Sequence, residues 1–351
     1  MQFSRKSAEA MPESQSPTAM AREIADIPGA ATRLLERGDA LASIAARIER
    51  FQPRRLMFCG RGSSSHIGVY LRYLAEVRLG IAASAAAPSV LTAYGARPEM
   101  RDLLFVVISQ SGQSTDLVAM SQAAREGGAL TLAIVNAEDS PVAQACELVA
   151  GIGAGPEVAV AATKTVVLSM IAGALLFSRW AHDAALAAAL YRLPLRLAAA
   201  HACEWAAWSK ALEGASAAFV AGRGYSQGPV KEVGLKLLET LRMPALAFSA
   251  AELRHGPRAA IGSATPVLVL RQHDATAPMV DVLARDLLAT GENVFVAGGP
   301  MGTLPWIADD DPVCDPVAML VPAYRAIEAA ARAKGFDPDN PPHLSKITRT
   351  L

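Results

Sequence analysis

The chain contains the stretch Leu103-Leu104-Phe105-Val106-Val107-Ile108-Ser109-Gln110-Ser111-Gly112-Gln113-Ser114-Thr115, which decides its fold. The apolar run at its start predicts a buried strand, and residues 116–126 after it have the pattern of a helix. The turn between them is rich in hydroxyl side chains, and it lies where the free N–H groups of a helix start point outward. Such a turn can bind a phosphate without Lys or Arg. A loop that only caps the helix is the alternative.

Strand and helix patterns alternate on both sides of this stretch. Strands are expected at residues 54–59, 103–108, 130–135 and 148–150, and residues 81–86 form a further short apolar run. Helices are expected at residues 20–37, with a break at Pro28-Gly29, and at 40–50, 66–79 and 163–182, the last of them long and buried. Residues 185–214 are expected to form a connector. This alternation predicts a parallel sheet with covering helices, which is an α/β fold.

The pattern then starts again. Residues 217–226 repeat the character of residues 56–64, because in both an apolar strand runs into Gly-Arg-Gly and hydroxyl side chains. Further strands are expected at 245–248, 266–270 and 293–297. A duplicated domain explains this better than chance does. The resulting division is a flexible tail (1–20), a first domain (21–200), a second domain (201–335) and a C-terminal tail (336–351).

Composition limits the classes of protein to consider. The chain has 351 residues, of which 52% are hydrophobic and 19% charged, so it can form two ordinary domains. Its formal net charge is zero and no Lys/Arg cluster stands out, so no nucleic-acid partner is expected. The longest apolar stretch, 165–177, is too short for a membrane span, and no signal peptide is visible. A cytoplasmic protein with no membrane partner is therefore expected.

No cofactor or metal is expected either. The four cysteines are scattered without a CxxC pair, so they are interpreted as reduced thiols and not as a zinc site or a disulfide framework. The Gly60-x-Gly62 sequence lacks the third glycine of a nicotinamide-binding turn.

Three charged residues in the second half are candidates for acid–base chemistry. Glu232, Lys236 and Glu239 would share one face of a helix. Solvated pairing on a helix surface is the ordinary interpretation of this spacing. The apolar residues around them, such as Val233 and Leu237, instead indicate a half-buried helix on which charges can be tuned for catalysis.

Several motifs in a fixed order make the chain, from about residue 20 onward, resemble the sugar-isomerase (SIS) domain family. They include Gly62-Ser63-Ser64, Ser109-Gln110-Ser111-Gly112, residues 157–164, residues 232–239, residues 252–257 and the segment from 334 to 346. The closest resemblance is to the isomerase half of glucosamine-6-phosphate synthase and to related sugar-phosphate deaminases. It implies two tandem SIS domains, each a parallel five-stranded sheet flanked by helices, in a homodimer.

The resemblance also implies a set of residues that bind a sugar phosphate. The phosphate loop would be Ser109, Gln110, Ser111 and Ser114, and Ser63 and Ser64 would bind sugar hydroxyls and phosphate. Val160 and Ala161 match a backbone segment that lines the sugar pocket, and Lys164 is expected to tether this segment without reacting.

The catalytic roles come from the same resemblance. Glu239 would shuttle a proton between C1 and C2, with Glu232 and Lys236 as supporting ionic residues. His255 would open the sugar ring from the neighbouring subunit, and Lys346 would form a Schiff base with the open-chain ketose. The remaining histidines are expected to be structural: His66, His182, His201, His273 and His343.

The expected activity is deamination of an aminosugar 6-phosphate. Glucosamine-6-phosphate would give fructose-6-phosphate and ammonia, because the first cysteine is Cys59 and no glutaminase nucleophile is visible to supply ammonia. A ketose–aldose isomerase and a deaminase of another aminosugar phosphate remain alternatives. A non-catalytic sugar-phosphate sensor is a further alternative, although a sensor would not need the complete acid–base set.

Overall fold

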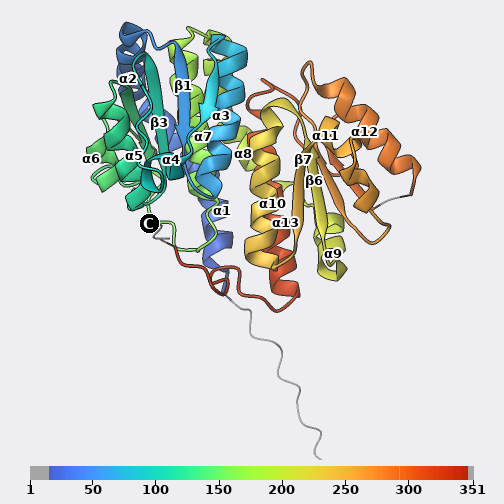
Figure 1. Cartoon of the computed structure of the whole chain (residues 1–351). Helices are drawn as coiled ribbons and strands as arrows, with labels where there is room; N and C mark the ends of the chain where they lie inside the picture. The colour runs from blue at the N-terminus through green and yellow to red at the C-terminus, as the bar shows by residue number, and fades with distance from the viewer. Residues whose placement is uncertain (1–15, 292, 347–351) are drawn as a thin grey trace, which may run out of the picture.

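The computed structural model describes residues 16–291 and 293–346. It contains two parallel sheets that lie side by side, each covered by helices (Figure 1). The first sheet has the order β2-β1-β3-β4-β5 and pairs in parallel throughout. Its strands are β1 (Arg55–Cys59), β2 (Ala83–Ala85), β3 (Leu103–Ser109), β4 (Leu130–Val135) and β5 (Leu148–Gly151). The central strand β3 is buried along its whole length, as its apolar sequence predicts.

Helices cover both faces of this sheet. They are α2 (Gly38–Phe51), α3 (Ser63–Leu74) with its π-helical continuation (Ala75–Leu79), α4 (Pro88–Thr92), α5 (Thr115–Glu126), α6 (Pro141–Ala145) and α7 (Lys164–Trp180). The expected long helix at 163–182 is confirmed as α7, which is buried on nearly every side because it packs against neighbouring helices as well as against the sheet. Within the described part of the chain, no helix is long and apolar enough to span a membrane.

The second sheet has the order β7-β6-β8-β9, and its pairings are also parallel. Its strands are β6 (Ala218–Gly222), β7 (Ala245–Ser249), β8 (Val267–Leu270) and β9 (Val294–Ala297). The described residues thus form four strands here, one fewer than expected. A single parallel bridge between Ala297 and Leu304 lies where a fifth strand would begin. Pro305 follows directly and lacks an N–H group, so it cannot extend the ladder.

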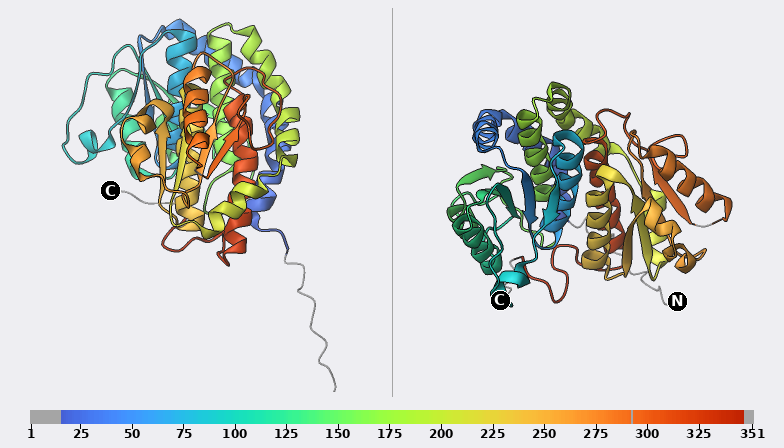
Figure 2. Two further views of the ribbon diagram at one scale, coloured as in Figure 1. Left: turned by 90° about the vertical axis from the view of Figure 1, so that its right-hand side faces the viewer. Right: turned by 45° about the horizontal axis from the view of Figure 1, so that its top comes forward.

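The helices of the second half are α10 (Gln227–Leu241), α11 (Ala250–Arg254), α12 (Ala277–Ala289) and α13 (Asp315–Ala333), with 3-10 turns at Gly224–Ser226 and Pro257–Ala260. Two helices, α8 (Ala184–Ala202) and α9 (Ala206–Gly214), form the expected connector. The two halves share one continuous apolar core, which includes Val106 of β3 and Val233 of α10. Within it α3 packs against α10, as two directions of view show (Figure 2). This packing brings the first residues of α3 next to the charged face of α10.

The first helix, α1 (Ala19–Glu36), differs from the sequence-based expectation in two ways. It is continuous through Pro28, where a break was expected, because its buried face packs against α7, α8 and α13. Such packing offsets the roughly 3 kcal/mol that a proline costs inside a helix. The helix also begins before the expected end of the N-terminal tail, since Thr18 caps it and Met20 is fully buried. The rest of that tail, residues 1–15, lies outside the described residues.

Candidate active site

The turn after β3 forms a cradle at the start of α5. The Ser109 Oγ accepts a hydrogen bond from the Gly112 N–H at 3.0 Å, and the Ser111 Oγ accepts one from the Gln113 N–H at 3.3 Å. Gly112 has a φ of +63°, and a Cβ there would lie 1.9 Å from the Ser140 Oγ. Only glycine therefore lets the loop turn this tightly. The hydroxyl groups of this loop and the N-terminus of α5 border the same cavity, and the dipole of the helix favours an anion there.

This cradle forms one end of a cavity of about 570 Å³. Seven of the eight predicted binding residues line it: Ser63, Ser64, Ser109, Gln110, Ser111, Ser114 and Val160. The exception is Ala161, which is buried at 1% exposure and does not line the cavity, so its expected place in the sugar-pocket backbone stays a prediction. Alternate residues of this segment face the cavity, so Val160 and Ala162 line it while Ala161 points into the core.

The predicted acid–base residues also meet here, on α10. The cavity is lined by Glu239, whose side chain is 21% exposed, while Glu232 and Lys236 lie behind it with no exposed surface. The Lys236 ammonium bonds to the Glu239 carboxylate and lies 3.3 Å from the Glu232 Oε1. It also donates to the Ser63 Oγ at 3.1 Å. This arrangement ties the predicted base to the start of α3, where the Ser63 Oγ also donates to the Glu232 Oε1 at 3.2 Å.

Burial and pairing act in opposite directions on these charges. Burial by itself raises the pKa of Glu232, but Lys236, His66 and Ser63 bring that pKa below its ordinary value. Burial likewise lowers the pKa of Lys236, and the two carboxylates raise it above the ordinary value. Both groups therefore stay charged, so the cavity wall holds a fixed cation beside Glu239.

His66 belongs to this network and was missed by sequence reasoning, which treated it as structural. Its Nδ1 lies 3.1 Å from the Glu232 Oε2. The available signal was spacing, because His66 follows Ser63 by three residues and so shares its face of α3. On the other side of Glu232, the Tyr324 hydroxyl donates to its Oε1 at 3.4 Å.

At the other side of the cavity lies Lys346, close to the end of the described chain. Its Nζ donates to the Glu157 Oε2 at 2.9 Å and to the Ala159 carbonyl at 2.7 Å. Glu157 is itself buried and accepts from the Thr163 and Thr165 N–H groups. Sequence reasoning quoted Glu157 as part of a motif but gave it no role at the site. The structure makes it the partner of the only lysine that lines this described cavity.

Two contacts hold the segments around Lys346 in place. The Asp339 carboxylate accepts from the N–H groups of Ala19 and Met20 at the start of α1, and its carbonyl accepts from the Val160 N–H. The Lys164 Nζ donates to the Asp26 Oδ2 at 3.0 Å and to the Pro156 carbonyl at 3.1 Å. Lys164 thus tethers its segment, as expected, and the C-terminal segment is docked against the first domain.

His255 is the predicted site residue that the single chain does not bring to the cavity. It is exposed, at the C-terminal end of α11, and does not line the cavity. Its expected role requires a second subunit, which leaves that role a prediction.

The described residues offer no obvious metal site. In residues 16–291 and 293–346, no group of three His, Cys, Asp or Glu side chains is arranged to hold a metal ion. The four cysteines are free thiols, as the sequence predicts. The side chains that line the cavity carry hydroxyl groups, the Gln110 amide, the Glu239 carboxylate, the Lys346 amine and the Arg61 guanidinium.

Comparison with known proteins agrees with this geometry. The SIS domain family model matches residues 51–179 and 211–297, which contain most of the two sheets. The chain belongs to the SIS domain family. This SIS protein is 38% identical to a crystallised protein of Silicibacter pomeroyi DSS-3 provisionally named a phosphosugar isomerase. The TM-score is 0.88, and the match covers 92% of this chain and 100% of that one.

Its curated relatives include enzymes named glutamine–fructose-6-phosphate aminotransferase (isomerizing). That of Symbiobacterium thermophilum is 31% identical over 331 residues, which cover 86% of this SIS protein and 52% of the relative. The chain spans about half the length of the curated relatives it matches. The glucosamine-6-phosphate deaminase of Thermotoga maritima, 22% identical with a TM-score of 0.80, covers 95% of this chain and all of its own and shares the fold.

Proposed function

We propose that this SIS protein deaminates and isomerises an aminosugar 6-phosphate, with glucosamine-6-phosphate as the first candidate substrate. The products would be the ketose 6-phosphate, here fructose-6-phosphate, and ammonia. The observation that carries the proposal is the single cavity lined by the hydroxyl cradle, the Glu239 carboxylate and the Lys346 amine. An anion anchor, a base and a nucleophile are what this chemistry needs.

The cradle and Glu239 would perform the isomerisation. The 6-phosphate would accept hydrogen bonds from Ser109, Ser111 and the first N–H groups of α5, which fixes one end of the open-chain sugar. Glu239 would remove the proton from C2 of the 2-amino aldose and return it to C1, passing through an enolamine to the ketose imine. The Lys236 ammonium bonds to the Glu239 carboxylate and would hold it in position for this transfer.

Lys346 would complete the deamination. Its amine must be neutral to add to C2 of the imine, and Glu157 at 2.9 Å is placed to take the proton. A proton then passes from the attacking nitrogen to the departing one, the C2–N bond breaks with its electron pair on the departing nitrogen, and ammonia leaves a Schiff base between C2 and Lys346. Water adds to C2 and releases the ketose phosphate and the free amine, so atoms balance over the cycle.

The comparisons support this reaction class but leave its direction and substrate to experiment. The curated relatives carry a name that pairs fructose-6-phosphate with amino-group transfer and isomerisation. A ketose–aldose isomerase is a second candidate, favoured by the phosphosugar isomerase name of the Silicibacter pomeroyi protein. Both reactions use the same C1–C2 proton transfer, so the amino group of the substrate distinguishes them.

A coupled assay tests the proposal. Purified protein is incubated with the 6-phosphates of glucosamine and galactosamine, and ammonia and ketose phosphate are measured together. We expect equal amounts of both products from at least one substrate. Ketose–aldose conversion without ammonia from any hexosamine phosphate would support the isomerase instead. Binding without turnover of any sugar phosphate would support the sensor.

We further propose that the active unit is a homodimer in which His255 opens the sugar ring at the partner's cavity. The exposed position of His255, away from its own chain's cavity, supports this. Mixing two inactive variants, Glu239→Gln and His255→Ala, tests it. Mixed dimers would have one cavity with both groups intact, so we expect up to about a quarter of the wild-type activity to return after subunit exchange. No recovery in dimers shown to have mixed would contradict the proposal.

A further inference from the structure

An ion pair between Arg61 and Asp116 lies next to the cradle, and sequence reasoning did not anticipate it. Arg61 lies in the turn between β1 and α3, and Asp116 is the second residue of α5. The Arg61 Nε and Nη2 lie 2.8 and 2.7 Å from the Asp116 Oδ2. The Asp116 side chain is 1% exposed, whereas that of Arg61 is 51% exposed and lines the cavity. The pair therefore joins the two loops that surround the cradle.

The position of Asp116 creates an electrostatic problem for an anion site. Its carboxylate lies in the first turn of the helix whose N-terminus faces the cradle, where it competes with a bound phosphate for positive potential. A buried, unpaired carboxylate would repel a phosphate dianion at short range. The guanidinium of Arg61 cancels this charge, and about half of the Arg61 side chain stays exposed at the edge of the cavity that it lines.

The other charged side chains lining the described cavity already have partners. Glu239 is bonded to Lys236, and Lys346 to Glu157. Arg61 is paired too, but with Asp116 in the first turn of α5, the helix that begins at the cradle, so its guanidinium is the cation beside the cradle's hydroxyl, amide and N–H groups.

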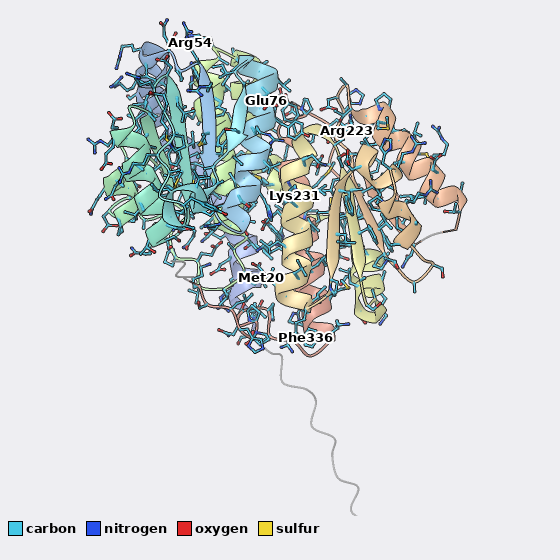
Figure 3. All side chains as sticks on the ribbon, in the orientation of Figure 1. Met20, Arg54, Glu76, Arg223, Lys231 and Phe336 are labelled. Atoms are coloured by element: carbon cyan, nitrogen blue, oxygen red, sulfur yellow. The ribbon has the colours of Figure 1, made fainter. Side chains whose placement is uncertain are left out.

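In the second domain, an amide side chain joins the corresponding loops, without a guanidinium–carboxylate pair between them in the described part of the chain. The Gly222-Arg223-Gly224 turn of this domain corresponds to Gly60-Arg61-Gly62, and Arg223 is labelled in Figure 3. There the buried Gln272 side chain connects the loops, because its Nε2 donates to the Arg223 carbonyl at 2.6 Å and to the Thr276 Oγ1 at 3.0 Å. The same Nε2 also donates to the Asp274 Oδ2 at 3.1 Å, so an amide joins these loops where the first domain uses a guanidinium, and this difference indicates a further role for Arg61.

We propose that Arg61 and Asp116 together set the affinity of the cradle for a phosphate dianion. Arg61 neutralises the buried carboxylate and offers its exposed edge to the phosphate of the substrate. The inference rests on the phosphate site of the proposed function and adds an arginine to it.

Titration calorimetry with inorganic phosphate at constant ionic strength tests the inference without catalysis. We expect Arg61→Ala to weaken phosphate binding about tenfold or more, since it removes a cation and exposes Asp116 to the anion. Asp116→Asn should strengthen binding severalfold, because Arg61 then keeps its full charge for the ligand. The double variant should bind more tightly than Arg61→Ala, because it has no uncompensated carboxylate. Thermal unfolding of each variant reports whether it is folded, and the double variant keeps the test possible if Arg61→Ala is not.

A matched control is Arg97→Ala, which breaks an exposed ion pair with Glu126 at the opposite end of α5 and should leave phosphate binding unchanged. Phosphate binding by folded Arg61→Ala within twofold of the wild type would overturn the inference. A double variant no tighter than Arg61→Ala would overturn the neutralising role. Absence of phosphate binding by the wild type itself would instead overturn the phosphate site of the proposed function, and this inference with it.

Discussion

Glu239→Gln is expected to lower kcat for the aminosugar phosphate by about 10²- to 10⁴-fold, the range that a positioned general base contributes. The amide keeps the shape of the side chain and can still contact Lys236, so the cavity should stay intact. KM should change little. The decisive measurement is exchange of the substrate's C2 proton with deuterium from solvent, which should disappear together with turnover.

A surface carboxylate provides the control for this variant. Glu126→Gln changes an exposed residue at the far end of α5 and should leave both kcat and proton exchange unchanged. Full activity in Glu239→Gln would mean that another group carries the proton.

Lys236→Met is expected to have the largest effect on stability. Lys236 is fully buried between Glu232 and Glu239, so its removal leaves a fully buried carboxylate without its cation. Breaking a buried pair in this way costs about 3–5 kcal/mol, and urea unfolding at pH 7 should show the loss. The double variant Glu232→Gln/Lys236→Met should recover part of it, because the unpaired charge is gone.

The pH dependence of this loss has a definite sign. In the wild type, the pKa of Glu232 in the folded protein lies below its ordinary value. The ionised, paired Glu232 therefore stabilises the fold fully at pH values above the ordinary pKa. This stabilisation is lost as the pH falls through the folded-state pKa. Without Lys236, burial favours the protonated carboxyl and the destabilisation should shrink between pH 7 and pH 5. An equal loss of unfolding free energy in Lys236→Met at pH 7 and at pH 5 would contradict this account of the charge network.

The arrangement of strands followed largely from local pattern. The apolar run before Ser109 and the alternation around it predicted the first sheet, because parallel strands buried on both faces must be apolar throughout. The continuity of α1 through Pro28 did not follow, because a local breaker signal was outweighed by burial against helices far away in sequence. Among the described residues, the second sheet lacks a fifth strand because Pro305 follows the single bridge at Leu304 and has no N–H group to continue the pairing. Whether that N–H group is needed depends on the neighbouring strand, which the local sequence does not specify.

The site was predictable where a motif is continuous in sequence. The cradle residues and Glu239 line one cavity, with Glu232 and Lys236 buried behind it, while their functional roles stay predictions. The ion pairs that join site residues far apart in the sequence were not predicted. His66 joins Glu232 across 166 positions, Arg61 joins Asp116 across 55, and Lys346 joins Glu157 across 189.

The sequence by itself determined the kind of loop after β3, the helix that starts there and the spacing of charges on α10, since these depend on neighbours within a few residues. The tertiary structure alone decided which charges neutralise one another and which stay available to a ligand. The physical reason is that a buried charge must be paired, and the packing of α3, α5, α10 and the C-terminal segment selects its partner. Only folding brings Arg61 next to the serine-rich cradle, through its ion pair with Asp116.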